Sequence, residues 1–138
     1  VFEATEADKN TTNAYSGENL ALGKPAEATN IEGANLPTLA VDGNYSTRWS
    51  SQQYGDATFV LDLKKAYDVK ALEMILESAW ISYRIEYSLD GENYTTLFEG
   101  EKDELVVELA QLDIQARYLR VRRDGDGWFS IYELKIFG

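Results

Sequence analysis

Ala40-Val-Asp-Gly-Asn-Tyr-Ser-Thr-Arg-Trp49 is the most informative stretch of this chain. Asp42-Gly43-Asn44 is a turn signal, because Asp and Asn side chains bond their own backbone and Gly supplies a positive φ. Trp49 offers a large apolar side chain that can hold this loop against a core. Four side chains add oxygen atoms that could surround a hard cation such as calcium, namely those of Asp42, Asn44, Ser46 and Thr47. The stretch therefore predicts either a plain surface turn before a buried tryptophan or a turn that binds a cation.

From residue 19 onward the apolar residues recur with a period of two, which is typical of half-buried β-strands. We expect strands at 58–63, 71–77, 83–88, 94–98, 105–109, 118–122 and 132–137, and one helical turn around 39–41. Turn formers such as Asp90-Gly91 separate these runs. Many short strands with little helix predict an all-β sandwich or jelly roll. Residues 1–18, whose second half (9–18) is polar, are expected to be a leader or linker remnant, or an edge strand.

The composition excludes several classes of function. The chain of 138 residues is of single-domain length, and it contains no cysteine and no histidine. Disulfides, thiol chemistry and a histidine-based triad are therefore impossible, and zinc or copper sites are not expected. The net charge of −11 argues against nucleic acid and anionic membranes as partners. No phosphate-binding loop or nucleophile elbow occurs, and no motif singles out a pair of acids, so we do not expect an enzyme.

Seven short motifs follow one another along residues 19–138. They are Asn19-Leu-Ala-Leu-Gly-Lys-Pro-Ala26, Ala40-Val-Asp-Gly43, Ser46-Thr-Arg-Trp-Ser-Ser51, Phe59-Val-Leu-Asp-Leu63, Tyr83-Arg-Ile-Glu-Tyr-Ser-Leu-Asp-Gly-Glu-Asn-Tyr94, Arg117-Tyr-Leu-Arg-Val121 and Ile131-Tyr-Glu-Leu-Lys-Ile-Phe-Gly138. With them the chain resembles the discoidin, or coagulation factor 5/8 type C, domain family, and most of all the bacterial carbohydrate-binding modules of family 32. The resemblance covers residues 19–138 and implies a galactose-binding-domain-like jelly-roll β-sandwich of about eight strands, five in one sheet and three in the other.

The resemblance also implies a structural calcium site. Glu133, in the closing strand, would reach the 40–47 loop and add a second carboxylate to that of Asp42. Thr47 would supply a hydroxyl, and the backbone oxygens of Ala40, Asn44 and Tyr132 would complete the shell. One Ca²⁺ would then tie the N-terminal half of the domain to its last strand. The alternative is a hydrogen-bonded turn without an ion.

Sugar binding needs a flat aromatic ring and convergent polar groups at its rim. Tyr54, Trp80 and Trp128 stand outside the alternating strands, and the resemblance implies that such loops meet at one end of the sandwich, with a sugar-stacking aromatic in the last loop. The full set of candidate ligand-binding residues is Gln53, Tyr54, Glu77, Trp80, Arg122, Arg123 and Trp128.

The three charged members of this set each have two interpretations. Glu77 could accept hydrogen bonds from sugar hydroxyls or pair with the ammonium of a glucosamine unit. Arg122 and Arg123 could donate to vicinal hydroxyls, or pair with Asp124 or Asp126 at the end of the strand. Trp49 is expected in the core, and Arg48 in a structural ion pair with a nearby carboxylate.

The specificity that the resemblance implies departs from galactose. Galactose-binding relatives use a histidine after the Trp-Ser-Ser segment and an arginine after the middle strand, where this chain has Gln52, Gln53 and Tyr54, and Glu77. We therefore predict a non-catalytic carbohydrate-binding module, secreted from a bacterium or attached to its surface, that targets a covalently attached glycoside hydrolase to polysaccharide. Short β-linked oligosaccharides of the mannan or gluco type are favoured as ligands, with chitosan-type amino sugars next. The alternative is a discoidin-type adhesion domain that binds a cell-surface glycan, protein or lipid.

Overall fold

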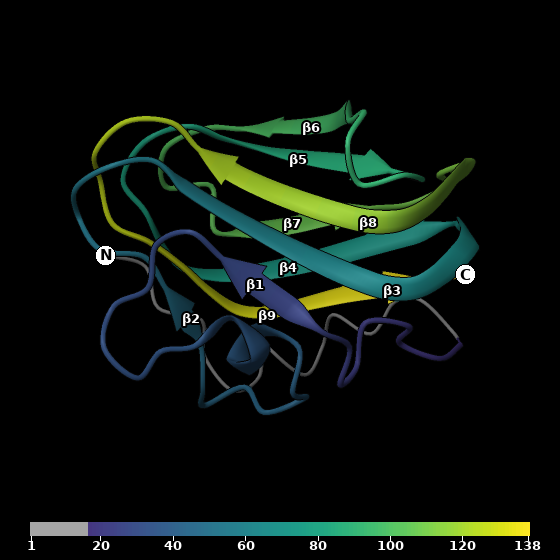
Figure 1. Cartoon of the computed structure of the whole chain (residues 1–138), viewed down its shortest axis with the longest axis horizontal. Helices are drawn as coiled ribbons and strands as arrows, with labels where there is room; N and C mark the ends of the chain where they lie inside the picture. The colour runs from purple at the N-terminus through teal and green to yellow at the C-terminus, as the bar shows by residue number, and fades with distance from the viewer. Residues whose placement is uncertain (1–16) are drawn as a thin grey trace.

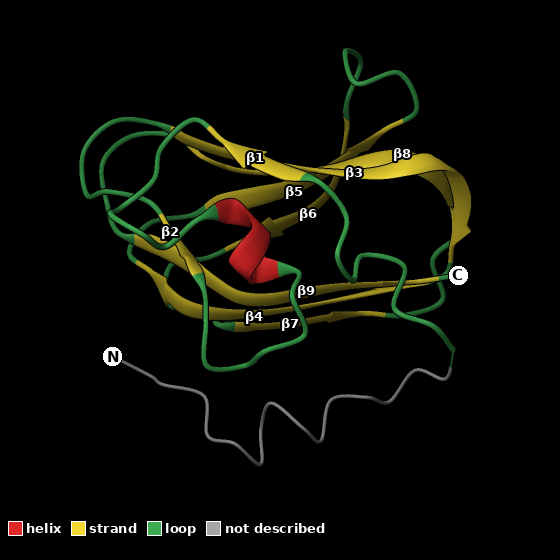
Figure 2. Ribbon diagram, turned by 60° about the horizontal axis from the view of Figure 1, so that its bottom comes forward, coloured by secondary structure: helices red, strands yellow, loops and turns green. Residues whose placement is uncertain are grey.

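The computed structural model describes residues 17–138, which form two antiparallel β-sheets packed face to face (Figure 2). One sheet has the strand order β1 (Ala26–Ala28), β3 (Ala57–Val69), β8 (Ile114–Arg123), β5 (Tyr83–Ser88) and β6 (Thr95–Gly100). The other has the order β2 (Trp49–Ser50), β9 (Phe129–Phe137), β4 (Ala71–Ala79) and β7 (Val106–Leu109). A single turn of 3₁₀ helix, η1 (Pro37–Ala40), precedes the 40–47 loop.

The predicted all-β sandwich is confirmed, with five strands in one sheet and four in the other in place of five and three. The seven strands expected from the alternation correspond to β3 through β9, and the expected helical turn corresponds to η1. Strands β1 and β2 are additional. They hold only 3 and 2 residues, too few for a period of two to be recognised. The predicted leader falls mostly on residues 1–16, which lie outside the described part of the chain.

The core lies between the two sheets and is built on aromatic packing around Trp49, as predicted. Trp49 is fully buried, and its ring centroid lies 5.3 Å from that of Phe59 and 5.9 Å from that of Phe129. The indole N–H donates a hydrogen bond to the Asn30 carbonyl at 3.1 Å. Because Phe59 lies on β3 and Phe129 on β9, Trp49 joins the two sheets and fixes the start of β2.

Several connections gather at one end of the sandwich. At the left of Figure 1, β4 turns into β5 and β8 turns into β9. The 51–56 loop reaches the same place, since the Gly55 N–H donates to Asp126 at 2.7 Å and the Gly127 N–H to the Gln53 carbonyl at 2.6 Å. This end therefore collects side chains from segments that lie far apart in the sequence.

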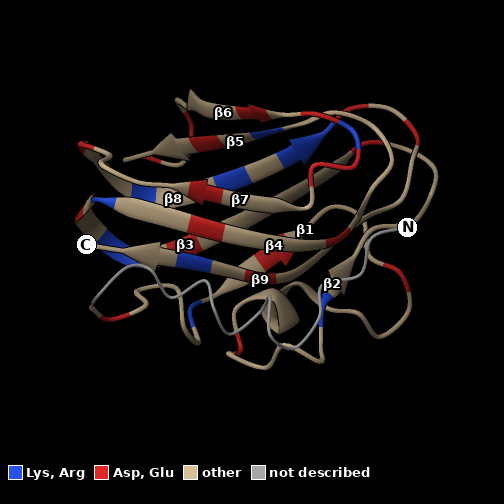
Figure 3. Ribbon diagram, turned by 180° about the vertical axis from the view of Figure 1, so that it is seen from behind, with Lys and Arg blue, Asp and Glu red and all other residues tan. Residues whose placement is uncertain are grey.

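Charge is distributed unevenly over the fold. In Figure 3 the acidic residues mark many of the loops, whereas the basic residues lie mainly on strands, β8 among them.

No helix in residues 17–138 is long and apolar enough to cross a membrane.

Candidate functional site

A groove of about 240 Å³ opens at the looped end of the four-stranded sheet. We call it the Trp groove, and its lining residues are Glu32, Arg48, Ser50, Glu77, Ser78, Trp80, Trp128 and Ser130. Three of the predicted ligand-binding residues, Glu77, Trp80 and Trp128, therefore lie together. They come from β4, from the β4–β5 loop and from the β8–β9 loop.

The floor of the Trp groove is a row of three serines across three neighbouring strands. The register pairs Ser50 of β2 with Ser130 of β9, and Ser130 with Ser78 of β4. The Ser50 and Ser130 hydroxyls are 2.7 Å apart, and the Ser78 hydroxyl donates to Ser130 at 3.4 Å. Successive side chains of a strand point to opposite faces, so the serines face outward while Trp49 and Phe129 enter the core.

The two tryptophans hold one wall of the groove. The backbone N–H of Trp80 donates to the Trp128 carbonyl at 3.1 Å, which fixes the two loops side by side. Trp80 is 45% exposed, whereas Trp128 is less exposed and of intermediate burial. An exposed indole beside hydroxyl groups combines an apolar ring face with polar groups at its edge.

Charged groups form the rest of the rim. The Arg48 guanidinium lies 3.8 Å from the Glu77 carboxylate and donates to the Ser50 hydroxyl at 3.1 Å. The expected ion pair of Arg48 is thus present, and it places Arg48 in the groove. Glu32 accepts a hydrogen bond from the Asn35 amide at 3.2 Å. Two carboxylates against one guanidinium give the groove a net charge of −1.

The other four predicted residues lie elsewhere. Gln53 and Tyr54 belong to the 51–56 loop and do not line the Trp groove. Tyr54 is 71% exposed. The predicted ligand-binding role of Arg123 is wrong. It is fully buried, and its guanidinium donates to the backbone carbonyls of Gly127 and Gly55, so it holds two loops together and cannot contact a ligand.

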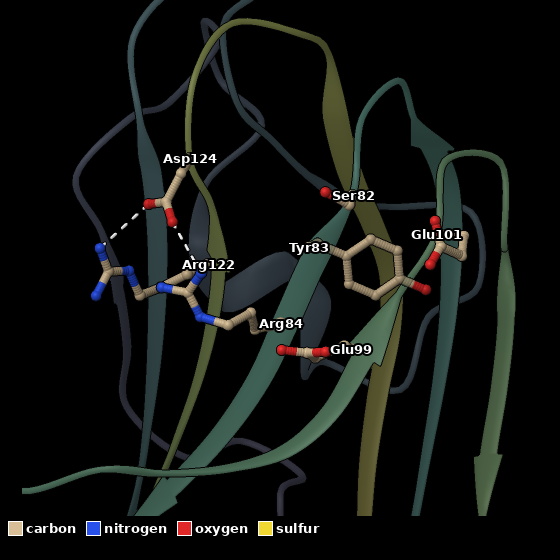
Figure 4. Close-up of a pocket in the computed structure, with 7 residues that line it drawn as sticks. All are labelled: Ser82, Tyr83, Arg84, Glu99, Glu101, Arg122 and Asp124. Atoms are coloured by element: carbon tan, nitrogen blue, oxygen red, sulfur yellow. Dashed lines mark hydrogen bonds and ion pairs between the residues drawn. The ribbon is translucent and has the colours of Figure 1, made fainter.

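Arg122 points to the opposite side of the five-stranded sheet from Arg123. It lines a second groove of about 280 Å³, the Arg groove, whose residues are Ser82, Tyr83, Arg84, Glu99, Glu101, Arg122 and Asp124 (Figure 4). Asp124 accepts hydrogen bonds from Arg84 at 2.9 Å and from Arg122 at 3.1 Å. The predicted pairing of Arg122 with Asp124 is therefore present.

The 40–47 loop brings several oxygen atoms around one hydroxyl. The Thr47 hydroxyl lies 2.6 Å from the Asp42 carboxylate, 3.0 Å from the Asn44 carbonyl and 3.5 Å from the Leu39 carbonyl. Glu133 reaches the same loop from β9, where its carboxylate accepts the Gly43 N–H at 3.1 Å. Asp42, Asn44, Thr47 and Glu133 of the expected calcium set thus converge, and the Leu39 carbonyl, which was not predicted, joins them.

The electrostatics of this loop fit a cation. Glu133 is 1% exposed, and one of its carboxylate oxygens has no hydrogen-bond partner. Burial and the neighbouring Asp42 carboxylate raise the pKa of Glu133 to about 8, against the lowering effect of the Gly43 N–H. No three His, Cys, Asp or Glu side chains cluster in residues 17–138, so carbonyl oxygens and the Thr47 hydroxyl would have to complete a hard-ion shell here.

Comparison with known proteins places this geometry in a family. A model of the F5/8 type C domain matches residues 25–134. Among solved structures, chitosan-binding module 1 of a chitosanase/glucanase from Paenibacillus sp. IK-5 superposes with a TM-score of 0.80 at 29% identity, covering 88% of this chain and 100% of that one. Chitosan-binding module 2 of the same enzyme, solved in complex with chitotriose, gives a TM-score of 0.75 at 28% identity, with 87% and 100% covered.

A curated relative matches over a shorter stretch. A polysaccharide lyase 8 family protein, HylA, from Enterococcus faecalis is 34% identical over 62 residues, which is 45% of this chain. The match spans only 4% of the length of that protein.

Proposed function

The chain belongs to the F5/8 type C domain family, and we propose that it acts through the Trp groove, which binds a few units of a β-linked polysaccharide. It is a non-catalytic carbohydrate-binding module. The observation that carries the proposed site is the adjacency of Trp80 and Trp128 beside a hydroxyl floor and a charged rim. An exposed indole covers the C–H face of a pyranose, and the planar polar groups fix its hydroxyls.

We place amino sugars ahead of the neutral mannan- or gluco-type ligands that the sequence favours. Glu32 and Glu77 outnumber Arg48 in the groove, and a carboxylate forms its strongest hydrogen bonds with a charged donor such as an ammonium. The binding of chitosan by the two similar Paenibacillus modules supports the same class of ligand. A shallow site of this kind corresponds to a Kd in the high micromolar to millimolar range, about 4–6 kcal/mol.

The 40–47 loop is proposed as a structural calcium site. Asp42 and Glu133 would supply carboxylates, Thr47 its hydroxyl, and Leu39 and Asn44 their carbonyls. A bound divalent cation supplies positive charge that offsets the repulsion between the two carboxylates. The site would tie the loop before β2 to β9, and both strands carry residues of the Trp groove.

In its parent protein the module is proposed to keep a secreted bacterial catalytic domain near its polysaccharide. A tether converts weak binding into a high local concentration of substrate. The Paenibacillus modules derive from a chitosanase/glucanase, and the Enterococcus faecalis relative is a polysaccharide lyase family protein, which supports attachment to such an enzyme.

Affinity electrophoresis tests the proposal. Wild-type protein is run on gels that contain chitosan, mannan or galactan, beside Trp128→Ala and the control Leu89→Ala, which removes an exposed apolar side chain outside the groove. We expect chitosan to retard the wild type and Leu89→Ala equally, and Trp128→Ala much less. Equal retardation of all three proteins on every gel would refute the stacking site.

A further inference from the structure

The 51–56 loop is held to the core by one asparagine. The Asn30 side chain donates to the Tyr54 carbonyl at 3.0 Å and accepts the Gln52 N–H at 2.8 Å. The Asn30 carbonyl in turn accepts the indole N–H of the buried Trp49. Each bond to a fixed group reduces the number of conformations that a loop can adopt. The 51–56 loop is therefore anchored to the core through Asn30.

Two aspartates join this loop to the β8–β9 loop in a reciprocal pattern. Asp126 of the β8–β9 loop accepts the Gly55 N–H at 2.7 Å, and Asp56 of the 51–56 loop accepts the Gly125 N–H at 2.7 Å. Both glycines have positive φ angles, of 83° and 90°, and glycine loses more conformational freedom on folding than any other residue. Each carboxylate therefore fixes a flexible position of the opposite loop.

A buried arginine completes the junction between the two loops. The Arg123 guanidinium donates to the carbonyls of Gly55 and Gly127, one in each loop. Burial lowers the pKa of Arg123, and the nearby Asp126 and Asp56 carboxylates oppose that shift. The two negative charges therefore offset part of the cost of burying the guanidinium. We call Arg123, Asp56 and Asp126 the loop clasp.

The loop clasp fixes the backbone directly before Trp128. Both polar backbone groups of Gly127 are bonded, because its N–H donates to the Gln53 carbonyl at 2.6 Å and its carbonyl accepts from the clasp arginine. The residue after Trp128 is also held, since the Phe129 N–H donates to the Ser51 hydroxyl at 3.2 Å. The indole of Trp128 therefore extends from a backbone that is fixed on both sides.

The two clasp carboxylates can reach a ligand only through this backbone. Neither Asp56 nor Asp126 lines the Trp groove, whereas Trp128 does. A ring that is already held in the binding orientation loses less conformational freedom when a sugar stacks on it. When only a fraction of the molecules hold the ring in that orientation, the observed affinity is reduced by that fraction.

We propose that Asp56 and Asp126 are positioning residues for sugar binding, which hold Trp128 in its binding orientation without touching the ligand. This inference rests on the proposed function and deepens it. It gives two acids outside the groove a role in its affinity, because they determine how the β8–β9 loop presents its indole ring.

NMR spectroscopy and calorimetry on Asp126→Ala test the loop clasp. In the free variant we expect the Trp128 indole N–H signal to broaden through exchange between orientations, while the Trp49 signal stays sharp. The Kd for chitotriose should rise about fivefold, as when about one molecule in five keeps the binding orientation. Asp126→Asn keeps an oxygen that can accept the Gly55 N–H, and it should recover most of the affinity.

The matched control is Asp90→Ala in the β5–β6 turn. The Asp90 carboxylate also accepts backbone N–H groups, those of Glu92 and Asn93, but it lies outside the Trp groove. This variant should keep the wild-type affinity for chitotriose and the wild-type Trp128 signal, whatever its melting temperature. A general loss of stability therefore cannot imitate the effect of Asp126→Ala.

Two results would overturn the positioning role, namely wild-type affinity in Asp126→Ala, or weaker binding with an unchanged Trp128 signal. The proposed function fails in a different measurement. If Trp128→Ala binds chitotriose as tightly as wild type, the Trp groove is not the sugar site. The Trp128 signal of free Asp126→Ala still reports whether the loop clasp holds that ring.

Discussion

The backbone N–H of Trp80 donates to the carbonyl of Trp128 at 3.1 Å, although the two residues lie in loops nearly fifty positions apart. This single bond joins the β4–β5 loop to the β8–β9 loop and holds both indole rings over the serine row. The site therefore depends on the relative position of these loops, and changes at a distance should affect it through them.

Glu77 is expected to select amino sugars. Replacing it by Gln removes the negative charge that faces Arg48 and the groove, so the affinity for glucosamine trimer should fall about tenfold. The affinity for mannotriose should change less than about twofold, because neutral hydroxyls can donate to an amide as well as to a carboxylate. Calorimetry on both sugars, with Glu108→Gln as control, distinguishes these effects. An equal loss for both sugars would show that Glu77 recognises hydroxyls rather than an ammonium.

Calcium is expected to stabilise the fold. A cation that binds only the native state at about a hundred times its Kd adds about 2.7 kcal/mol, which corresponds to a rise in melting temperature of about 5–10 °C. Scanning fluorimetry with calcium and with a chelator measures this rise. In Asp42→Asn, which lacks one of the two carboxylates, the rise should be largely lost. A wild-type melting temperature that is insensitive to both calcium and chelator would contradict the site.

Arg123 is expected to be a structural residue. Its buried guanidinium joins the Gly55 and Gly127 carbonyls, so Arg123→Met leaves both without a partner and should lower the free energy of unfolding by about 2–4 kcal/mol. The neighbouring Arg122→Met removes a partly exposed ion pair and should cost about 1 kcal/mol or less. Urea denaturation compares the two variants. The opposite order of stability would contradict the assignment.

The Asp62–Arg117 pair should make stability depend on pH. Arg117 donates to both carboxylate oxygens of Asp62, at 2.9 and 3.2 Å, and this hydrogen bonding lowers the pKa of Asp62 against the opposing effect of burial. A carboxylate with a lowered folded-state pKa contributes stability above its unfolded pKa and loses it as the pH falls through the folded value. Asp62→Asn should therefore be less stable than wild type at pH 7, by about 1 kcal/mol. The difference should shrink steadily in the acidic range below the ordinary aspartate pKa, as measured by urea titrations at several pH values. A difference that does not change with pH would rule out the charge as its origin.

The strands that could be predicted are those long enough to alternate. Strand β5 spans Tyr83–Ser88 in both the sequence and the structure, because its apolar residues recur at every second position up to clear turn signals. Strands β1 and β2 owe their pairing to neighbours in the sheet rather than to their own residues. A two-residue strand such as Trp49–Ser50 carries no local signal.

The site was predictable where a residue type alone indicates chemistry. Trp80 and Trp128 could be identified because they interrupt or follow turn segments, where an indole has little reason to be buried. The serine row could not, since Ser50, Ser78 and Ser130 become neighbours only through the register of three strands. Arg123 did carry a usable signal. Leu119 and Val121 occupy the inward face of β8, and the same alternation turns position 123 inward as well.

The most direct test of the Trp groove uses the three tryptophans of the chain as internal probes. In a ¹⁵N NMR titration with chitotriose, the indole N–H signals of Trp80 and Trp128 should shift and saturate together, because both rings line the groove. The Trp49 signal should stay in place, since that ring is fully buried and bonded to the Asn30 carbonyl. If the Trp80 and Trp128 signals remain unmoved while the sugar binds elsewhere or not at all, the Trp groove is not the binding site.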